Sequence, residues 1–179
     1  IKLSNLENLK KQILDLAGEY SRIDLAEKPF IGGITHIPVT GKKIDETDIQ
    51  NLIESSLDAW FTSGHFTEKF EKKINQFLGT RHTLFVNSGS SANLIALSAL
   101  KELYEINDGD EVITCAVGFP TTINPIIQNN MVPVLVDADL STYNINADLI
   151  EDAITKKTKG IVLAPVSYTH LRAHETREY

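Results

Sequence analysis

The polar segment NSGSS at residues 87–91 lies between an apolar run and a pattern typical of a helix. The first backbone N–H groups of a helix have no partner within it, and the helix dipole favours negative charge at this end. Gly89 would allow a close backbone approach, and Ser90 and Ser91 would add hydroxyl donors. These three residues therefore predict a phosphate site. Capping of the helix by the same polar side chains is the alternative.

A second candidate for chemistry is Phe119, in the segment CAVGFPTT. It lies at the predicted carboxyl end of the next strand, immediately before a helix that Pro120 would open. An aromatic ring at that place could stack on a flat cofactor, and packing into the core is the alternative. A phosphate site and a stacking ring at neighbouring strand ends together predict a phosphorylated aromatic cofactor. The sequence has neither a Walker pattern nor G-x-G-x-x-G, so it does not support nucleotide-binding loops of those kinds.

The elements that would position these residues alternate between strand and helix. Short apolar strands are predicted at residues 83–86, 111–115, 132–136 and 160–164, and helices at 91–105, 120–128 and 146–155. This order predicts an α/β fold with a mostly parallel sheet and helices on both faces. Ligands of such sheets bind beyond the carboxyl ends of the strands, which is where both candidates lie.

Further helices are predicted before the sheet. Apolar spacing indicates a helix at 5–20, and an extended connector at 28–41 follows it, rich in Gly and Pro. Asp45 is predicted to open a second helix. Thr67 is predicted to cap a third helix, with Gly79 as its stop.

Composition narrows the class of protein. The 179 residues can bury one sizeable core, and a formal net charge of −7 argues against a general nucleic-acid binder. Cys115 is the only cysteine, which excludes an internal disulfide and suits a reducing compartment. The sequence shows no secretory signal and no apolar run near the ~20 residues of a membrane span. We therefore expect a cytoplasmic protein without a nucleic-acid or membrane partner.

Residues 165–179 lack apolar periodicity and turn signals. Back-translation of VSYTHLRAHET, which begins at Val166, fits a transposase-type sequencing adaptor read in frame. We expect this tail to be non-native and exclude it from the fold, with a genuine polar tail as the alternative. His170, His174 and Glu175 are for that reason not interpreted as a metal site.

The sequence resembles the DegT/DnrJ/EryC1/StrS family, the sugar-modifying branch of the fold-type I pyridoxal-phosphate (PLP) enzymes. The resemblance runs from about Lys28 to Ala164 and rests on GKKIDETDI, SSLDAWFTSGHFTEKFE, VNSGSSANLIALSAL, GDEVITCAVGFPTTINPIIQNNMVPVLVDADLSTYNI and KTKGIVLA. The segment GFPTTINPIIQN is most similar to the family's CDP-4-keto-6-deoxyglucose 3-dehydratases, which act in lipopolysaccharide biosynthesis. The implied fold is the N-terminal part of the large domain of an aspartate-aminotransferase-like enzyme.

The resemblance implies roles for the candidate residues. Gly89, Ser90 and Ser91 would form the first part of a phosphate cup for PLP or its amine form, pyridoxamine phosphate (PMP). Phe119 would lie over the pyridine ring. Trp60 and Thr62 belong to a W-x-T-x-G segment of the family, and His65 follows it directly. The resemblance implies that these three residues contact the sugar substrate.

Some of these positions have alternative roles. His65 stands where many relatives have an arginine, which puts a charged substrate contact there in doubt. Trp60 could instead be a hydrophobic anchor between two helices. Asp137 and Asp139 follow a predicted strand and are interpreted as turn residues, not as catalysts.

The resemblance also implies a domain organisation: an N-terminal helix and connector at 1–44, a partial PLP-binding large domain at 45–164, and the tail at 165–179.

The catalytic residues and the cysteines of a [2Fe–2S] cluster are expected further along a longer parent protein, so none is assigned here and the fragment is expected to be inactive. The parent would be a homodimer acting on a nucleotide-linked keto-deoxysugar, with an iron–sulfur reductase as partner if it is a dehydratase. A nucleotide-sugar aminotransferase of the same family and a non-catalytic regulator with this fold are the alternatives.

Overall fold

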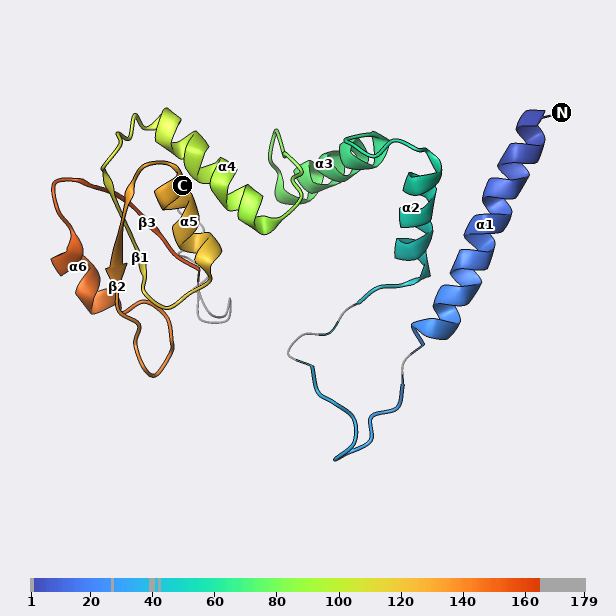
Figure 1. Cartoon of the computed structure of the whole chain (residues 1–179), viewed down its shortest axis with the longest axis horizontal. Helices are drawn as coiled ribbons and strands as arrows, with labels where there is room; N and C mark the ends of the chain where they lie inside the picture. Colours follow the sequence, from blue (N-terminus) through green and yellow to red (C-terminus); the bar gives the residue numbers. More distant parts are fainter. Residues whose placement is uncertain (1, 27, 39–40, 42, 165–179) are drawn as a thin grey trace. The chain divides into compact units, whose positions relative to one another are not determined.

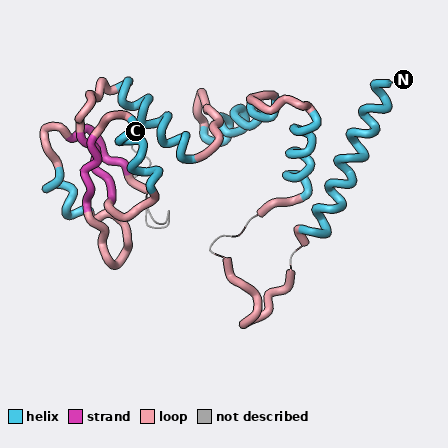
Figure 2. The backbone as a smooth tube through the Cα atoms, in the orientation of Figure 1, coloured by secondary structure: helices cyan, strands magenta, loops and turns pink. Residues whose placement is uncertain are grey.

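The computed structural model describes residues 2–26, 28–38, 41 and 43–164 (Figure 1). The chain divides into two compact units, Ile1–Phe85 and Val86–Tyr179, and each is described by itself. Among the described residues, the regular structure of the first unit is helical, whereas the second combines helices with a sheet (Figure 2). The ranges 1–44 and 45–164 remain predictions, and the tail at 165–179 lies outside the described residues.

The first unit begins with an antiparallel pair of helices. Its helices are α1 (Lys2–Asp24), α2 (Glu46–Leu57) and α3 (His65–Leu78). Lys10 Nζ lies 2.8 Å from Glu54 Oε1, and Gln50 Nε2 donates a hydrogen bond to the Leu14 carbonyl at 3.0 Å. Early residues of α1 thus meet late residues of α2. The predicted helix at 5–20 is confirmed, and α1 extends beyond it at both ends.

The start of α2 confirms the predicted role of Asp45. Its Oδ1 accepts hydrogen bonds from the backbone N–H groups of Thr47 at 2.8 Å and Asp48 at 3.1 Å. Asp48 Oδ2 in turn accepts a hydrogen bond from the Asp45 N–H at 3.0 Å. This reciprocal capping box satisfies donors that the helix cannot satisfy internally.

The third helix begins earlier than the sequence suggests. Gly64 is the N-cap of α3, and Thr67 lies inside the helix as its third residue, so the predicted cap at Thr67 is wrong. The extended backbone of Gly64, with φ −148° and ψ −161°, starts the helix without a side-chain bond. The predicted stop at Gly79 is confirmed. This residue takes a left-handed φ of 69°, and its N–H donates to the Asn75 carbonyl.

The second unit contains a parallel sheet of three strands within the described residues. Its elements are α4 (Gly89–Leu103), β1 (Glu111–Cys115), α5 (Pro120–Gln128), β2 (Val132–Val136), the 3₁₀ helix η1 (Ala147–Leu149), α6 (Ile150–Ala153) and β3 (Thr158–Val162). The strand order is β2–β1–β3, and both pairings are parallel. In register, Ile113 lies opposite Val134 on one side and Ile161 on the other.

The core of this unit lies where the sheet meets α4 and α5. Val112 of the central strand is 2% exposed and clusters with Leu97 of α4, Ile126 of α5 and Met131. Ile113 is fully buried as well, and as the next residue of the strand it points to the opposite face. In Figure 1, α5 lies to one side of the strands and α6 to the other. The predicted α/β fold, a parallel sheet with helices on both faces, is confirmed.

The strand predicted at residues 83–86 is wrong. This segment has no regular structure and joins no ladder of the described residues. The N–H of Phe85 instead donates to Glu71 Oε1 at 2.9 Å, and its ring packs edge-on against Phe70 at 5.0 Å. The carboxylate of Glu71 on α3 therefore occupies the Phe85 N–H, which would otherwise be available to pair with a neighbouring strand.

Three other predicted boundaries shift. The helix predicted at 91–105 begins two residues earlier, at Gly89, because Ser88 provides the cap. It ends at Leu103, with Tyr104 as its C-cap. The helix predicted at 146–155 is instead a 3₁₀ turn followed by the single turn of α6. The strand predicted at 160–164 lies two residues earlier, where residues 158–162 pair with β1.

Candidate functional site

A short network of polar side chains builds the first turn of α4. Ser88 caps the helix: its Oγ accepts a hydrogen bond from the Ser91 N–H at 3.2 Å and donates one to Ser91 Oγ at 3.2 Å. Ser91 Oγ donates to Asn87 Oδ1 at 2.6 Å. Capping by this Ser/Asn cluster was the alternative to a phosphate site in the sequence analysis, and Ser88 of the cluster is indeed the cap.

Gly89 and Ser90 occupy the first two positions of α4, and both are exposed. Among the described residues, neither their backbone N–H groups nor the Ser90 hydroxyl has a hydrogen-bond partner. A Cβ built on Gly89 would meet no atom within 4 Å, and the first turn contains no acidic residue. These open donors, together with the helix dipole, can bind an anion such as phosphate.

Phe119 is the N-cap residue of α5, directly before Pro120 at the first helical position. Its side chain is 72% exposed, so it is not part of the core formed by the described residues. Asn93 Nδ2 in the first turns of α4 donates to the Thr121 carbonyl in the first turn of α5, at 3.4 Å. The helices α4 and α5 therefore begin next to one another, and the structure brings the open N–H groups and the exposed ring to the same end of this unit.

These residues fit two parts of a PLP molecule. The open donors of Gly89 and Ser90 suit its phosphate, and the exposed face of Phe119 suits its ring. A titratable partner for the pyridine nitrogen and a side chain that would bond to the cofactor are not assigned among the described residues. The residues at this end of the unit can therefore bind and orient a cofactor, and no catalytic step is assigned to them.

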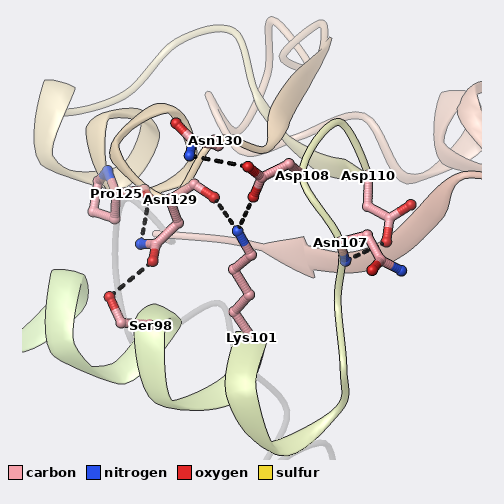
Figure 3. Close-up of polar contacts among 8 residues, drawn as sticks. All are labelled: Ser98, Lys101, Asn107, Asp108, Asp110, Pro125, Asn129 and Asn130. Atoms are coloured by element: carbon pink, nitrogen blue, oxygen red, sulfur yellow. Dashed lines mark hydrogen bonds and ion pairs between the residues drawn. The ribbon is translucent and has the colours of Figure 1, made fainter.

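The other end of α4 is fixed by a cluster of polar contacts around Lys101 (Figure 3). Lys101 Nζ donates to Asp108 Oδ1 at 2.5 Å and to the Asn129 carbonyl at 2.6 Å. Ser98 Oγ donates to Asn129 Oδ1 at 2.9 Å. The hydrogen bond from Lys101 holds the pKa of Asp108 below its ordinary value, with a smaller contribution from Asn130. The cluster fastens α4 to the turn between α5 and β2, while the first turn of α4 stays open.

In the first unit, the loop between α2 and α3 surrounds a hollow of about 320 Å³. The residues that line it are Ser55, Asp58, Trp60, Thr62, Gly64, His65, Phe66 and Thr67. The structure thus brings the three predicted substrate residues together in this hollow. Trp60 is 62% exposed, so it is not a buried anchor among the described residues.

Two contacts hold the shape of this hollow. Trp60 Nε1 donates to the Ser63 carbonyl at 2.8 Å, and a Cβ on Gly64 would come within 3.1 Å of Trp60 Cδ1. His65 Nδ1 lies 3.3 Å from Asp58 Oδ2. Sequence reasoning missed Asp58, because nothing in its spacing shows that the loop folds His65 back onto the end of α2.

Asp139 is a turn residue, as predicted. Its Oδ1 accepts hydrogen bonds from the Ser141 N–H at 2.7 Å and the Thr142 N–H at 3.1 Å, and it also pairs with the Ser141 hydroxyl. These bonds, that of the Ser141 hydroxyl first, hold the pKa of Asp139 below its ordinary value. Asp137 Oδ1 accepts from the Ala138 N–H at 2.8 Å, which is likewise a turn contact.

Two kinds of feature are absent from the part of the chain that the structure describes. No helix there has both the length and the apolar character needed to cross a bilayer. No cluster there of three or more His, Cys, Asp or Glu side chains could hold a metal ion. Cys115, at the end of β1, is a half-buried free thiol.

Comparison with known proteins gives a consistent set of relatives. The family model described as the DegT/DnrJ/EryC1/StrS aminotransferase family matches residues 42–169. The chain is 50% identical over 161 residues to the lipopolysaccharide biosynthesis protein RfbH of Salmonella typhimurium, which covers 88% of this chain and 37% of RfbH. It is 43% identical over 173 residues to the dTDP-4-dehydro-2,6-dideoxy-D-glucose 3-dehydratase of Saccharopolyspora spinosa, which covers 94% of this chain and 37% of that enzyme.

Solved structures include a protein with the same fold. The Escherichia coli GDP-4-keto-6-deoxy-D-mannose-3-dehydratase with bound hydrated PLP matches with a TM-score of 0.61 and 31% identity, over 70% of this chain and 33% of that one. The chain spans 37% of the length of the two curated relatives. On the family match over most of its residues, the chain belongs to the DegT/DnrJ/EryC1/StrS aminotransferase family.

Proposed function

We propose that the intact protein containing this chain is a PLP- or PMP-dependent nucleotide-sugar 3-dehydratase of the CDP-4-keto-6-deoxy-D-glucose type, acting in deoxysugar and lipopolysaccharide O-antigen biosynthesis. The observation that carries the proposal is the open first turn of α4 beside the exposed Phe119, because this pair suits a phosphorylated aromatic cofactor. The 3-dehydratase reaction is favoured by the likeness to the Saccharopolyspora enzyme and to the Escherichia coli structure.

In this proposal, the chain's own residues bind and orient the cofactor. The N–H groups of Gly89 and Ser90 and the Ser90 hydroxyl bind the phosphate, and Ser91 completes the cup and steadies its turn through Asn87. Phe119 lies against the face of the ring. PLP and PMP, when bound, supply an electron sink for a carbanion formed next to an imine. The donors at α4 and the aromatic face fix the orientation in which that sink is presented.

The hollow of the first unit is the proposed contact for the nucleotide-linked keto-deoxysugar. The exposed indole of Trp60 offers a flat apolar face for a sugar ring. Thr62 and His65 offer polar groups that can hydrogen-bond its hydroxyls. Asp58, paired with His65 in the structure, orients the imidazole.

The remaining parts of the proposal belong to the longer protein. We place the lysine or histidine that acts on the cofactor outside this chain, and likewise the cysteines of a [2Fe–2S] cluster, because such a cluster needs four ligands and Cys115 is the only cysteine. The intact protein is proposed to be a cytoplasmic homodimer that receives electrons from an iron–sulfur reductase. The family resemblance supports the cluster, the homodimer and the reductase, and the single cysteine suits a reducing compartment such as the cytoplasm.

Turnover by the intact enzyme tests the proposal. Protein expressed from the complete gene, loaded with PMP and supplied with the reductase, is incubated with CDP-4-keto-6-deoxyglucose, and products are followed by mass spectrometry. Loss of the C3 hydroxyl as water, dependent on PMP and reductant, is the expected result. Transfer of an amino group from glutamate to the sugar, without dehydration, would instead identify the family's aminotransferase activity. Absence of both reactions in cofactor-loaded protein would favour a non-catalytic regulator and reject the proposal.

A further inference from the structure

A series of ionic contacts joins α1 to the hollow between α2 and α3. Lys10 Nζ on α1 lies 2.8 Å from Glu54 Oε1 and 3.9 Å from Asp58 Oδ1. The other oxygen of the same carboxylate, Asp58 Oδ2, lies 3.3 Å from His65 Nδ1. Asp58 and His65 both line the hollow. Asp58 therefore stands between an ammonium group of α1 and an imidazole that lines the hollow.

The orientation of the His65 imidazole depends on Asp58. One ring nitrogen, Nδ1, faces the Asp58 carboxylate, and the ring centroid lies 4.2 Å from that of Phe66. The contact at Nδ1 leaves Nε2 as the nitrogen available to a ligand, and Nε2 has no partner among the described residues. In a histidine, the partner of one nitrogen sets the role of the other. The place of the Asp58 carboxylate thus decides how His65 meets a sugar hydroxyl.

Asp58 occupies an unfavourable place for a negative charge. It is the C-cap of α2, where the helix dipole disfavours an anion, and Glu54 lies four residues before it, a spacing at which like charges repel. The last turn of α2 contains no basic residue. Lys10, supplied by α1, is close to both carboxylates and offsets both unfavourable effects.

The directions of two pKa shifts agree with this role of Lys10. Its hydrogen bond to Glu54 holds the pKa of that carboxyl below its ordinary value, and the charges of His65 and Lys69 contribute less. In return, the hydrogen bond with Glu54 raises the pKa of Lys10, with a smaller contribution from the charge of Asp58. Lys10 is therefore a stable cation beside Asp58 at neutral pH.

We propose that Lys10 is a positioning residue for the substrate hollow: it holds the Asp58 carboxylate in place and thereby fixes the orientation of His65. The inference deepens the proposed function and rests on it, because that function places the nucleotide-linked sugar in this hollow. Lys10 also offsets the negative charge of Asp58, which would otherwise repel the diphosphate of such a substrate. Since α1 ends at Asp24 and the family match begins at residue 42, the positioning group comes from outside the matched segment.

Steady-state kinetics of the intact, cofactor-loaded enzyme test the role of Lys10. Lys10→Met is expected to raise KM for the CDP-linked sugar about two- to fivefold, the effect of losing a partly exposed ion pair, and to leave kcat nearly unchanged. Lys10→Arg keeps the charge and is expected to restore most of the affinity. Lys11→Met, at an exposed neighbouring position, is the matched control and is expected to keep the parental KM. A loss confined to kcat, or a Lys10→Arg variant as impaired as Lys10→Met, would overturn the inference.

A double-mutant cycle shows whether Lys10 acts through Asp58. Asp58→Asn keeps the size of the side chain and removes its charge. In that background, Lys10→Met is expected to leave KM unchanged, because the carboxylate that Lys10 holds is gone. An effect of Lys10→Met as large in the Asp58→Asn background as in the parent would show that Lys10 acts only through Glu54 or the packing of α1, which contradicts the proposed route.

Hydrogen exchange tests the same coupling without turnover. Peptides that cover residues 59–64 of the intact protein are followed by mass spectrometry in the parent and in the variants. Lys10→Met is expected to speed exchange in this loop, and to cause no further increase in the Asp58→Asn background. If exchange behaves in this way but the protein transforms no nucleotide sugar, the proposed function fails and the positioning of the loop by Lys10 stands. Unchanged exchange in Lys10→Met would overturn the inference whatever the activity.

Discussion

Replacing Ser90 by alanine separates cofactor binding from folding at the first turn of α4. The Ser90 hydroxyl has no hydrogen-bond partner among the described residues, whereas the Ser91 hydroxyl is bonded to Asn87 and Ser88. Ser90→Ala therefore leaves the free energy of unfolding without cofactor within about 0.5 kcal/mol of the parent, as for most surface substitutions. Ser91→Ala removes the hydrogen bonds of its hydroxyl with Ser88 and Asn87, keeps the capping bond of its backbone N–H, and lowers that stability by about 1 kcal/mol.

The expected loss of affinity follows from the kind of bond removed. A hydrogen bond to a charged group contributes about 1.5–3 kcal/mol, and each 1.4 kcal/mol corresponds to a tenfold change in Kd. If the Ser90 hydroxyl donates to the cofactor phosphate, Ser90→Ala raises the Kd for PLP by about 10- to 140-fold. Because that bond is made only to the phosphate, the affinity for pyridoxal, which has none, is expected to change little.

The assay is a titration of the intact protein with PLP and with pyridoxal, followed by absorbance, together with thermal unfolding of the cofactor-free protein. The parent protein and the Ser91→Ala variant are the references for affinity and for stability. A Ser90→Ala protein that binds PLP as tightly as the parent would refute the assignment of this hydroxyl to the phosphate. Equal weakening for PLP and pyridoxal would show a general disturbance of the site.

Three further predictions concern the scaffold of the second unit. Lys101→Met removes the 2.6 Å bond to the Asn129 carbonyl and lowers the free energy of unfolding by about 1.5–3 kcal/mol in denaturant titrations. Thr114→Val is expected to raise the melting temperature, because Thr114 Oγ1 is buried without a partner among the described residues, at a cost of about 1–2 kcal/mol. The turn at Asp139, whose pKa is lowered, keeps its order above about pH 4 and loses it as the pH falls through that lowered pKa. The shift of the Ser141 amide in NMR spectra follows this change.

Each of these has its own control. Lys156→Met, at an exposed position, should leave stability nearly unchanged, and an equal loss in both lysine variants would contradict the role of the Lys101 cluster. A lower melting temperature for Thr114→Val would show that the threonine hydroxyl is bonded in solution. Asp139→Asn should abolish the acid transition of the turn, and its persistence would assign the transition to another group.

Segments with strong local signals were predictable from the sequence. The bounds of β1, α5 and β2 agree with prediction at both ends. The two strands are apolar stretches between residues that favour turns, and Pro120 marks the start of α5. Gly109 and Asn130, both with positive φ, form two of those turns. The N-cap at Asp45 was predictable because its signal is local as well. Its carboxylate accepts hydrogen bonds from the backbone N–H groups of Thr47 and Asp48, which lie within three residues of it.

The wrong predictions depend on contacts between distant residues. The apolar run at 83–86 has the composition of a strand, but a strand also needs a neighbour, and here Glu71 takes the Phe85 N–H. Likewise, the residue types at the first turn of α4 predicted donors, but not that the Ser91 hydroxyl turns toward Asn87 while that of Ser90 stays open. The approach of Asp58 to His65 depends on the path of a whole loop.

A crystal structure of the intact protein with PLP tests the central claim most directly. We expect the phosphate at the first turn of α4, with its oxygens within hydrogen-bond distance of the Gly89 and Ser90 N–H groups and the ring against Phe119. A phosphate bound elsewhere, with these donors facing water, would contradict the proposed site and the function built on it.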